Sequence, residues 1–211
     1  MKSDKNNGKT VPKAVIKRLA LYSRTLHRME MNGENKVSSS NLAERLGLNP
    51  AQVRKDLAHF GQFGVPGYGY RSSRLRDELR KILGTDRIVR VGIVGVGNLG
   101  RALLSYPGFR NQGFKFILAF DSDQRKIGHK INDIRISDVN ELEEILEGNP
   151  VDIVILSVPA RVAQDVTDRL VHSGVHAILN FVPLRLTVPP DVKVHYVDLA
   201  MELESLSFYL R

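Results

Sequence analysis

The chain contains no cysteine among its 211 residues. Disulfides, thiolate-bound zinc, iron–sulfur clusters and a catalytic thiol are therefore excluded, and the composition fits a reducing compartment. Long hydrophobic runs are also missing, since none reaches the roughly 20 residues that a bilayer span needs. The polar start, Met1 to Lys9, lacks the apolar stretch of a signal peptide. We therefore expect a cytoplasmic protein without a membrane segment.

Acidic residues are scarce in the first part of the chain. Residues 1–87 hold 18 Lys and Arg against 8 Asp and Glu, whereas residues 88–211 hold 13 against 15. The net charge of +8 therefore belongs to the N-terminal part. A domain that faces the phosphates of DNA shows this asymmetry, although a basic surface can also serve solubility alone.

The N-terminal part has the pattern of three helices followed by a glycine-rich loop. Apolar residues recur at helical spacing over residues 12–31. Serines at 38–40 offer N-caps to a short second helix that Gly47 can end, and Asn49 begins a third helix that stops at Gly61. Two short helices joined by a tight turn form a helix-turn-helix unit, and the glycine- and aromatic-rich residues 61–70 predict a wing hairpin.

The third helix carries hydrogen-bond donors opposite its apolar residues. Val53, Leu57 and Phe60 are expected to point inward, which turns the donors outward, where they suit base edges and phosphates of the major groove. A solvated helix face is the competing explanation, and the basic charge favours DNA. The DNA-contact residues that we predict for the helices and the wing are Arg45, Gln52, Arg54, Lys55, His59, Tyr68, Tyr70 and Arg71.

From Ile88 onward, apolar β-branched runs alternate with helical patterns. The runs cover residues 88–94, 114–120, 151–158, 177–182 and 192–197, with helices expected at 99–105, 140–146 and 161–173. Such strands separated by helices predict an α/β fold with a doubly wound parallel sheet. The expected order is a winged-helix domain (residues 1–84), a Rossmann-type domain (85–198) and a C-terminal helix (199–211).

The strongest local signal is Gly95-Val96-Gly97-Asn98-Leu99-Gly100, directly after the first of these strands. Its glycines allow a tight turn and close approach of the backbone to a pyrophosphate, and the following helix supplies N–H donors. Asp121 stands 21 positions after Gly100, close to the roughly 20 expected for a ribose-binding acid. Its charge would repel a 2′-phosphate, so the pattern favours NAD(H) over NADP(H). A turn that binds nothing, or one that binds another nucleotide such as coenzyme A, remains an alternative.

The ends of two later strands complete the predicted ligand site. Ser157, Val158 and Pro159 follow one strand, and Asn180 and Phe181 end another. Ligands of open α/β sheets bind at such strand ends, so these residues are predicted to line the nicotinamide. The alternative is that the prolines after the strands merely terminate them.

A catalytic apparatus is not recognisable in the sequence. The six histidines show neither metal-ligand spacing nor an acid–base arrangement. The only extra domain is the small basic one, which leaves no place for a second substrate. We therefore expect no catalytic residue and no metal. A small NAD-dependent oxidoreductase with a basic appendage is the alternative.

Together these motifs resemble the Rex family of redox-sensing repressors over essentially the whole chain. The stretches that carry the likeness are Arg18-Leu19 with Tyr22 and Arg24, residues 52–57 with Phe60-Gly61, 67–70, 106–109, 178–181 with Pro183, and 197–199. The resemblance implies a repressor that binds a pseudo-palindromic operator when NADH is scarce and releases it when NADH binds.

The resemblance also implies a homodimer whose C-terminal helix is exchanged between subunits, whereas the residues alone show only a helix with leucines on one face. It further implies that Arg24, Tyr106 and Asp198 from the facing subunit form a polar switch. This switch would link the position of the winged-helix domain to whether the nucleotide is bound. One departure is Lys130-Ile131-Asn132-Asp133, where relatives often carry glycine. It leaves the conformation of that loop open.

Overall fold

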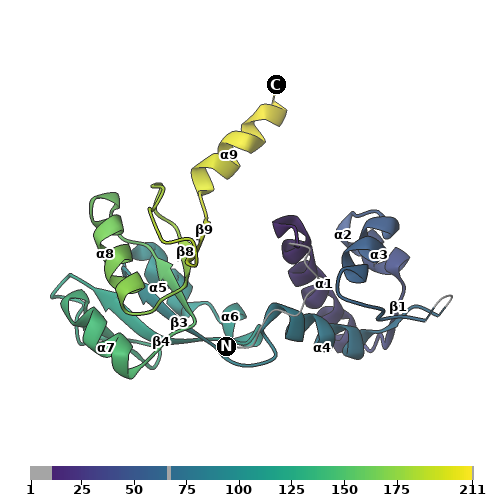
Figure 1. The fold of residues 1–211 in the computed structure, drawn as a ribbon, viewed down its shortest axis with the longest axis horizontal. Coiled ribbons are helices and arrows are strands. Elements are labelled where there is room, and N and C mark those ends of the chain that lie inside the picture. Colours follow the sequence, from purple (N-terminus) through teal and green to yellow (C-terminus); the bar gives the residue numbers. More distant parts are fainter. Residues whose placement is uncertain (1–10, 66–67, 211) are drawn as a thin grey trace. The chain divides into compact units, whose positions relative to one another are not determined.

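The computed structural model describes residues 11–65 and 68–210 (Figure 1). It divides the chain into two compact units, Met1–Arg87 and Ile88–Arg211. The sequence-based boundary, between residues 84 and 85, falls a few residues earlier, directly after the last helix of the first unit. The predicted wing residues Pro66 and Gly67 and the C-terminal Arg211 lie outside the described residues.

The first unit is a small helical domain with a two-stranded sheet. Its elements are α1 (Lys13–Met31), β1 (Lys36–Val37), α2 (Ser39–Leu46), α3 (Pro50–Ala58), β2 (Tyr70–Arg71) and α4 (Ser72–Leu83). The predicted caps are confirmed: Ser38 Oγ accepts from the Asn41 N–H, Asn49 Oδ1 accepts from the Ala51 N–H, and Gly47 ends α2 with φ 63°. The second and third helices thus begin where local capping rules place them.

Two details of this unit differ from the expectation. Helix α3 ends at Ala58 rather than Gly61, because the His59 and Phe60 N–H groups bond three residues back and tighten the last turn. The stretch 61–70 does not form a hairpin by itself: β2 pairs with β1, and only a single bridge joins Val65 to Gly69. A two-residue strand such as β1 is too short to show a pattern in the sequence.

The core of the first unit joins all four helices. The stripe that the sequence predicts on α1 is buried and packs against residues of α2, α3 and α4. The fully or almost fully buried members of this cluster are Val15, Leu19, Tyr22, Leu26, Met29, Val37, Leu42, Ala43, Val53, Leu57, Leu75 and Leu79. Phe60, which we expected inward, is only half-buried at the rim of this cluster.

The second unit contains a seven-stranded sheet with strand order β5-β6-β4-β3-β7-β8-β9. The strands are β3 (Val89–Val94), β4 (Phe114–Asp121), β5 (Lys130–Ile131), β6 (Ile134–Asp138), β7 (Ile153–Leu156), β8 (Ala177–Asn180) and β9 (Lys193–Tyr196). The helices are α5 (Asn98–Ser105), α6 (Gly108–Asn111), α7 (Leu142–Gly148), α8 (Ala160–His172) and α9 (Leu199–Ser207), with 3-10 turns at Val139–Glu141 and Phe208–Leu210.

The sheet confirms the doubly wound α/β fold. Strands β6, β4, β3, β7, β8 and β9 run parallel, and the chain reverses its direction of travel across the sheet between β3 and β7. Only β5 is antiparallel, in a hairpin with β6. The sequence missed this hairpin because β5 is a two-residue edge strand and neither strand has a continuous apolar run.

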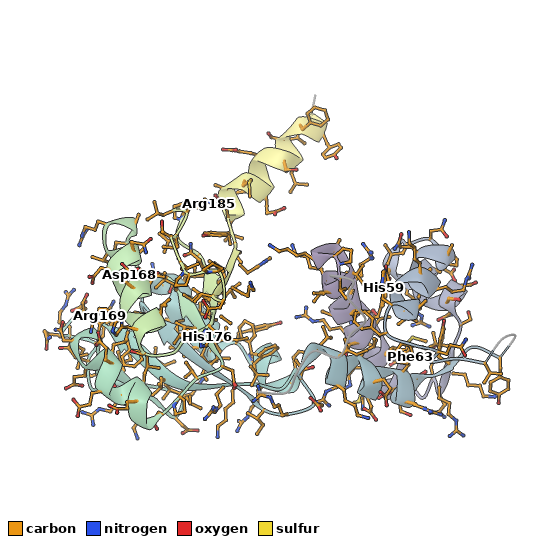
Figure 2. The ribbon with its side chains drawn as sticks, viewed as in Figure 1. His59, Phe63, Asp168, Arg169, His176 and Arg185 are labelled. Atoms are coloured by element: carbon orange, nitrogen blue, oxygen red, sulfur yellow. The ribbon has the colours of Figure 1, made fainter. Side chains whose placement is uncertain are left out.

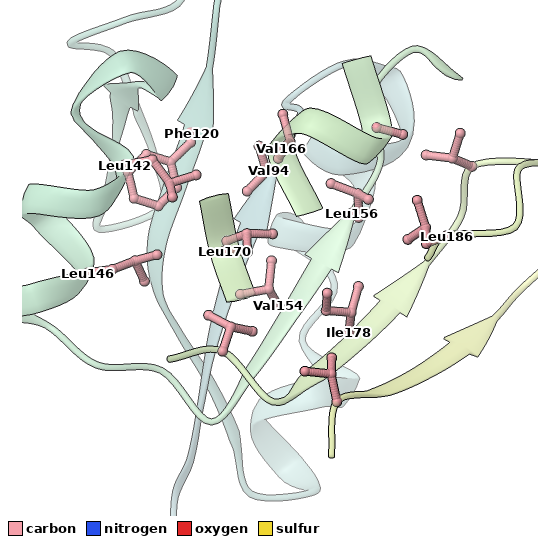
Figure 3. Packing of buried hydrophobic residues seen from close by; sticks show 14 residues of the cluster. Val94, Phe120, Leu142, Leu146, Val154, Leu156, Val166, Leu170, Ile178 and Leu186 are labelled. Atoms are coloured by element: carbon pink, nitrogen blue, oxygen red, sulfur yellow. The ribbon is translucent and has the colours of Figure 1, made fainter. Parts of the chain in front are cut away.

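Both faces of the sheet are covered. Alternate strand residues point to opposite faces, so Val154 and Leu156 pack under α7 and α8, whereas Ile155 packs on the other face together with Leu104 of α5. Figure 3 shows the first of these clusters, which includes Phe120 of the sheet, Leu142 of α7 and Leu170 of α8. This packing fixes the strand ends on which the ligand site is built.

Helix α9 leaves the compact part of the second unit. It extends away from the sheet, and all of its residues are exposed (Figure 1). Within the described residues, no helix is both long and apolar enough to span a membrane.

Candidate functional site

The glycine turn, residues 95–100, connects β3 to α5 and has two glycines that the fold itself requires. A Cβ at Gly95 would lie 2.3 Å from the Ser157 carbonyl oxygen, and φ there is 95°. A Cβ at Gly100 would lie 2.1 Å from the Gly95 carbonyl oxygen. Side chains at these two positions are therefore incompatible with the turn and with its packing against the strands.

Gly97 is different, because a Cβ at this position would meet nothing within 4 Å. The space above Gly97 adjoins the N-terminus of α5, whose first residues Asn98 and Leu99 are exposed. No described side chain caps this helix end, so its N–H groups and positive dipole end are available to an anion. A pyrophosphate fits this open space and these donors.

Asp121 ends β4 beside the turn and is ionised. Its carboxylate accepts hydrogen bonds from the N–H groups of Val96 (2.7 Å) and Asp123 (2.9 Å), and from Lys126 Nζ (2.9 Å). Burial works against its charge, but these donors outweigh burial and lower the pKa of Asp121. The carboxylate thus braces the glycine turn directly, through Val96.

Lys126 was not anticipated as part of this site. Its ammonium compensates part of the Asp121 charge, which weakens the repulsion of a 2′-phosphate on which the predicted NAD(H) preference rests. Nothing in the spacing of the sequence marks Lys126, because it comes from a turn after β4 whose fold the pattern does not specify.

The strand ends predicted to line the nicotinamide come together where the parallel strands reach their carboxyl ends. Ser157 Oγ donates to the Gly95 carbonyl at 2.8 Å, which ties the end of β7 to the glycine turn. Val158 is half-buried and Pro159 is exposed just before α8. Phe181 is half-buried and packs against the cluster beneath the turn.

Asn180 has a different environment, because it is fully buried. Its amide nitrogen donates to the carbonyls of Val182 and Leu184, and its oxygen accepts from the Val182 N–H. The side chain therefore shapes the loop after β8, and its contact with a ligand stays a prediction.

The outer face of α3 presents Arg54 and Lys55, which are exposed. Arg54 also reaches Ser39 Oγ at 3.3 Å across to α2. Gln52 does not point straight outward as expected, because its Nε2 donates to Asp56 Oδ1 at 2.6 Å. His59 is half-buried at the end of α3 (Figure 2). Its ring is edge-on to the Phe60 ring.

Arg45 lies on α2 and is paired within the unit. Its guanidinium donates to Glu34 at 2.8 Å and to Asn41 Oδ1 at 3.1 Å. These exposed contacts are weak and salt-sensitive, so a phosphate can compete for the same guanidinium.

The wing is held by close backbone contacts and a basic residue that the sequence did not single out. Gly69 has φ 82°, and a Cβ there would lie 2.6 Å from the Val37 carbonyl oxygen. Lys36 on β1 hydrogen-bonds the Tyr68 hydroxyl and lowers the pKa of this exposed tyrosine. Lys36 also pairs in register with Arg71, so two cations stand side by side on the sheet.

Tyr70 differs from Tyr68 in burial. Its ring is half-buried, packs at the rim of the core and lies so close to Gly64 that a Cβ there would be 2.7 Å from it. Tyr70 therefore supports the wing from inside, and a direct DNA contact by its ring stays a prediction.

The three residues of the expected switch lie in both units. Arg24 is exposed on α1. Tyr106 is exposed and stacks edge-to-face on Phe109 at 5.3 Å. Asp198 is the N-cap of α9, where its carboxylate accepts from the N–H groups of Ala200 and Met201. Arg24 and Tyr106 are thus accessible to a further partner, whereas Asp198 already caps a helix.

The described residues contain no group of three or more His, Asp and Glu that could hold a metal ion. A basic winged-helix unit and an open glycine turn beside an ionised carboxylate, carried by one chain, define the class of ligand-regulated DNA-binding proteins.

Comparison with known proteins extends this class to a family. Residues 10–58 match a family described as putative DNA-binding protein N-terminus, and residues 86–184 match one described as CoA binding domain. The chain is 48% identical over 97% of its length to the redox-sensing transcriptional repressor Rex of Carboxydothermus hydrogenoformans, covering 98% of that protein. It is 47% identical to Rex of Desulfitobacterium hafniense, covering 94% of each chain. The chain therefore belongs to the Rex family of redox-sensing transcriptional repressors.

Solved structures agree with this assignment. The chain superposes with a TM-score of 0.91, at 41% identity, on RSP in complex with NAD⁺ and operator DNA, covering 96% of this chain and 93% of that one. With RSP bound to NADH the TM-score is 0.86 at 39% identity, covering 96% and 95% of the two chains. RSP is described as a Rex-family repressor. The expected family and fold are confirmed, and the oxidoreductase alternative is not favoured.

Proposed function

We propose that this chain is a transcriptional repressor that binds operator DNA when NADH is scarce and releases it when NADH binds. The observation that carries the proposal is the presence, in one chain, of a basic helix-turn-helix unit and of the open space at Gly97 beside ionised Asp121. The structure of RSP with NAD⁺ and operator DNA supports the same pairing of ligands.

The ligand site of the proposal combines four strand ends. The glycine turn and the α5 N-terminus hold the pyrophosphate, and Asp121 accepts hydrogen bonds from the adenosine ribose. Residues Ser157, Val158, Pro159, Asn180 and Phe181 surround the nicotinamide. NADH is favoured over NAD⁺ because the oxidised ring carries a positive charge that an apolar, water-poor pocket disfavours.

The DNA interface of the proposal combines α3 and the wing. Gln52, Arg54, Lys55 and His59 face the major groove, and Arg45 binds a phosphate nearby. Tyr68, Tyr70 and Arg71 contact the DNA backbone or the minor groove. Lys36 joins them because it lies opposite Arg71 in the β1–β2 pair. We assign residues 1–84 to DNA binding, 85–198 to NADH binding and 199–211 to dimerisation.

The proposed assembly is a homodimer that exchanges α9 and binds a pseudo-palindromic operator in the cytoplasm. Support comes from α9 itself, where Leu203 is 68% and Leu206 62% exposed although both are apolar. In the dimer, Arg24, Tyr106 and Asp198 from the facing subunit form a hydrogen-bonded group with two alternative arrangements. Each arrangement belongs to one position of the winged-helix domains.

The test is binding of the full chain to a labelled palindromic AT-rich operator, measured by fluorescence anisotropy at one fixed salt concentration. Tight binding that NADH reverses and NAD⁺ reverses much less is the expected result, with coupling of about 1–3 kcal/mol. Binding that is indifferent to both nucleotides would remove the sensor function, and failure to bind any specific sequence would remove the repressor.

A matched pair of variants separates DNA contact from general charge. Lys55→Ala removes an exposed cation of α3 and is expected to weaken DNA binding without altering NADH binding. Lys81→Ala removes an exposed cation of α4 that pairs with Glu78 and is expected to change neither.

Coenzyme A is a second candidate ligand, because residues 86–184 match the family described as CoA binding domain. The same anisotropy titration with coenzyme A in place of NADH decides between them. Release of the operator by coenzyme A, but not by NADH, would replace the ligand and leave the DNA-binding function in place.

A further inference from the structure

The side chain of Gln52 is hydrogen-bonded to the buried carboxylate of Asp56. Both residues belong to α3, the proposed recognition helix. Its Nε2 lies 2.6 Å from Asp56 Oδ1, one helical turn further along α3. Asp56 is completely buried. Its carboxylate also accepts from Arg18 Nε at 2.5 Å, Arg18 Nη2 at 2.8 Å and the Tyr22 hydroxyl at 2.7 Å, all donated from α1. Asp56 thus has partners on two helices.

The chemistry of this contact fixes the direction of the amide. An ionised carboxylate has no hydrogen to donate, so only the nitrogen end of the Gln52 amide can face it. Burial opposes ionisation of Asp56, but the hydrogen bonds from Arg18, Tyr22 and Gln52 prevail and keep its pKa below the ordinary value. A flipped amide would set two oxygens 2.6 Å apart. The carbonyl oxygen of Gln52 is therefore turned away from Asp56.

Gln52 also stands where a recognition helix meets the bases. It is the third helical residue after the N-cap Asn49, and the N-terminal residues of such helices contact base edges. It is half-buried, while Val53 beside it is buried and Arg54 is exposed. This boundary position lets one end of the amide contact the protein and leaves the other end to a ligand.

We propose that Asp56 is a positioning residue that orients Gln52 so that its carbonyl oxygen accepts a hydrogen bond from a base amino group of the operator. On the strand that Gln52 faces, adenine and cytosine carry such an amino group in the major groove, whereas guanine offers acceptors and thymine an acceptor and a methyl group. Each half-site therefore has one position where adenine or cytosine is selected. This inference rests on the proposed DNA-binding function.

The test is selection of DNA from a library of palindromic AT-rich sites randomised along each half-site, with sequencing of the fraction bound by the full chain. The wild type is expected to show one position per half-site that prefers adenine or cytosine. Gln52→Met keeps the length of the side chain and removes the amide, and should reduce this preference by roughly 5- to 150-fold at that position alone. Gln124→Met is the matched control, since Gln124 also donates to a carboxylate, Asp138, but lies in the second unit.

The positioning role has its own readouts. Asn at position 56 can both donate and accept, so Asp56→Asn frees the amide to turn and should let guanine and thymine be tolerated at the same position, with an unchanged salt dependence of binding. If this variant does not fold, nuclear magnetic resonance of the wild type decides. The Gln52 side-chain amide, assigned by its absence in Gln52→Met, should exchange with water more slowly than the amide of exposed Gln62.

The outcomes separate this inference from the proposed function. If the wild type selects no sequence at all, both fail. If it selects a sequence but Gln52→Met keeps every preference, or if guanine or thymine is preferred at the position that Gln52→Met alters, DNA binding stands and the role of Gln52 is wrong. Equal exchange of the Gln52 and Gln62 amides, or an unchanged preference in folded Asp56→Asn, would remove the role of Asp56.

Discussion

Gly97 differs from the glycines on either side of it in the turn. Gly95 and Gly100 are required by contacts with the chain's own backbone, whereas a side chain at Gly97 would enter free space. Its backbone, with φ −76°, is also open to any residue. We therefore expect the reason for a glycine at this position to lie in the ligand and not in the fold.

A pair of substitutions tests this distinction. We expect Gly97→Ala to leave the unfolding temperature unchanged and to weaken NADH binding about tenfold, because the new methyl group competes with the pyrophosphate. Gly100→Ala should instead lower the free energy of unfolding by about 1–3 kcal/mol, since it overpacks against backbone. Thermal unfolding and isothermal titration calorimetry measure the two effects, with Gly148→Ala, also in open space, as the control. Unchanged NADH affinity in Gly97→Ala would contradict this account.

Asn132 lies in the loop between β5 and β6, where the resemblance led us to expect a glycine. It has φ 52°, the only positive value among the described non-glycine residues, and its Nδ2 donates to the Leu104 carbonyl at 3.0 Å. Asparagine tolerates this left-handed conformation better than other side chains do. The two-residue loop between β5 and β6 thus keeps the turn that glycine would allow, and adds a hydrogen bond.

Substitutions at this loop have a definite order of stability. Asn132→Ala is expected to lower the free energy of unfolding by about 1–2 kcal/mol, because alanine is strained at this φ. Asn132→Gly should cost less, since it loses only the hydrogen bond. Urea unfolding followed by circular dichroism ranks them, with Asp133→Ala as the neighbouring control. An alanine variant as stable as the glycine variant would show that the backbone is not strained here.

The sequence predicts residues whose role depends on near neighbours and misses those whose role depends on distant ones. The caps Ser38 and Asn49 and the glycine turn follow local rules, and the structure confirms these elements. The partners of Asp56 and Asp121 do not, because Arg18 lies 38 positions from Asp56, and Lys126, although close to Asp121 in the sequence, reaches it from an irregular turn. Which ligand atoms these side chains contact is likewise set by the ligand, and stays a prediction.

Helix α3 is tied to α1 through Asp56. Arg18 and Tyr22 of α1 both donate to its carboxylate, and Tyr22 is fully buried. A buried charge left without donors is costly, so this set of hydrogen bonds fixes the position of the recognition helix on the domain.

Removing one donor should weaken this connection measurably. Tyr22→Phe keeps the ring and removes the hydroxyl, and is expected to cost about 2 kcal/mol in the free energy of unfolding. The native pKa of Asp56 is depressed, so its stabilisation is complete above its ordinary value of 3.8 and is lost as the pH falls below it.

In Tyr22→Phe the native pKa rises toward that ordinary value, so acid unfolding of the first unit should begin at higher pH. Circular dichroism as a function of pH measures this shift, and Tyr68→Phe, at an exposed tyrosine, is the control. Identical acid midpoints for wild type and Tyr22→Phe would mean that the hydroxyl does not stabilise the charge.

Element boundaries show the limit of pattern analysis. Long amphipathic helices and apolar strands, such as α1 and β3, lie close to where the sequence places them. Short elements such as β1 and β5 were missed, because two residues carry no period and their pairing is decided by the partner strand.

At the scale of the whole molecule, the exposed apolar face of α9 is the feature that the proposed dimer would cover. Leu199, Leu203 and Leu206 are each at least 60% exposed. Burying one leucine side chain stabilises an interface by about 1.5–3 kcal/mol. The proposed exchange of α9 between subunits would bury this face twice in each dimer.

The double substitution Leu203→Glu and Leu206→Glu tests this assembly. It is expected to raise the dimer dissociation constant at least about a hundredfold, because two charges would have to be buried with the face. Analytical ultracentrifugation measures it, and Glu204→Ala on the same helix should leave the dimer intact. A variant that remains dimeric at low concentration would show that α9 does not form the interface.

The edges of the sheet determine how the molecule behaves at high concentration. At one edge, β5 has only two residues, one of them Lys130, and at the other β9 carries Lys193 after Pro189 and Pro190. Short edge strands, lysines and nearby prolines discourage another chain from adding a strand. We therefore expect the hairpin at residues 130–138 to protect this edge of the sheet against edge-to-edge aggregation.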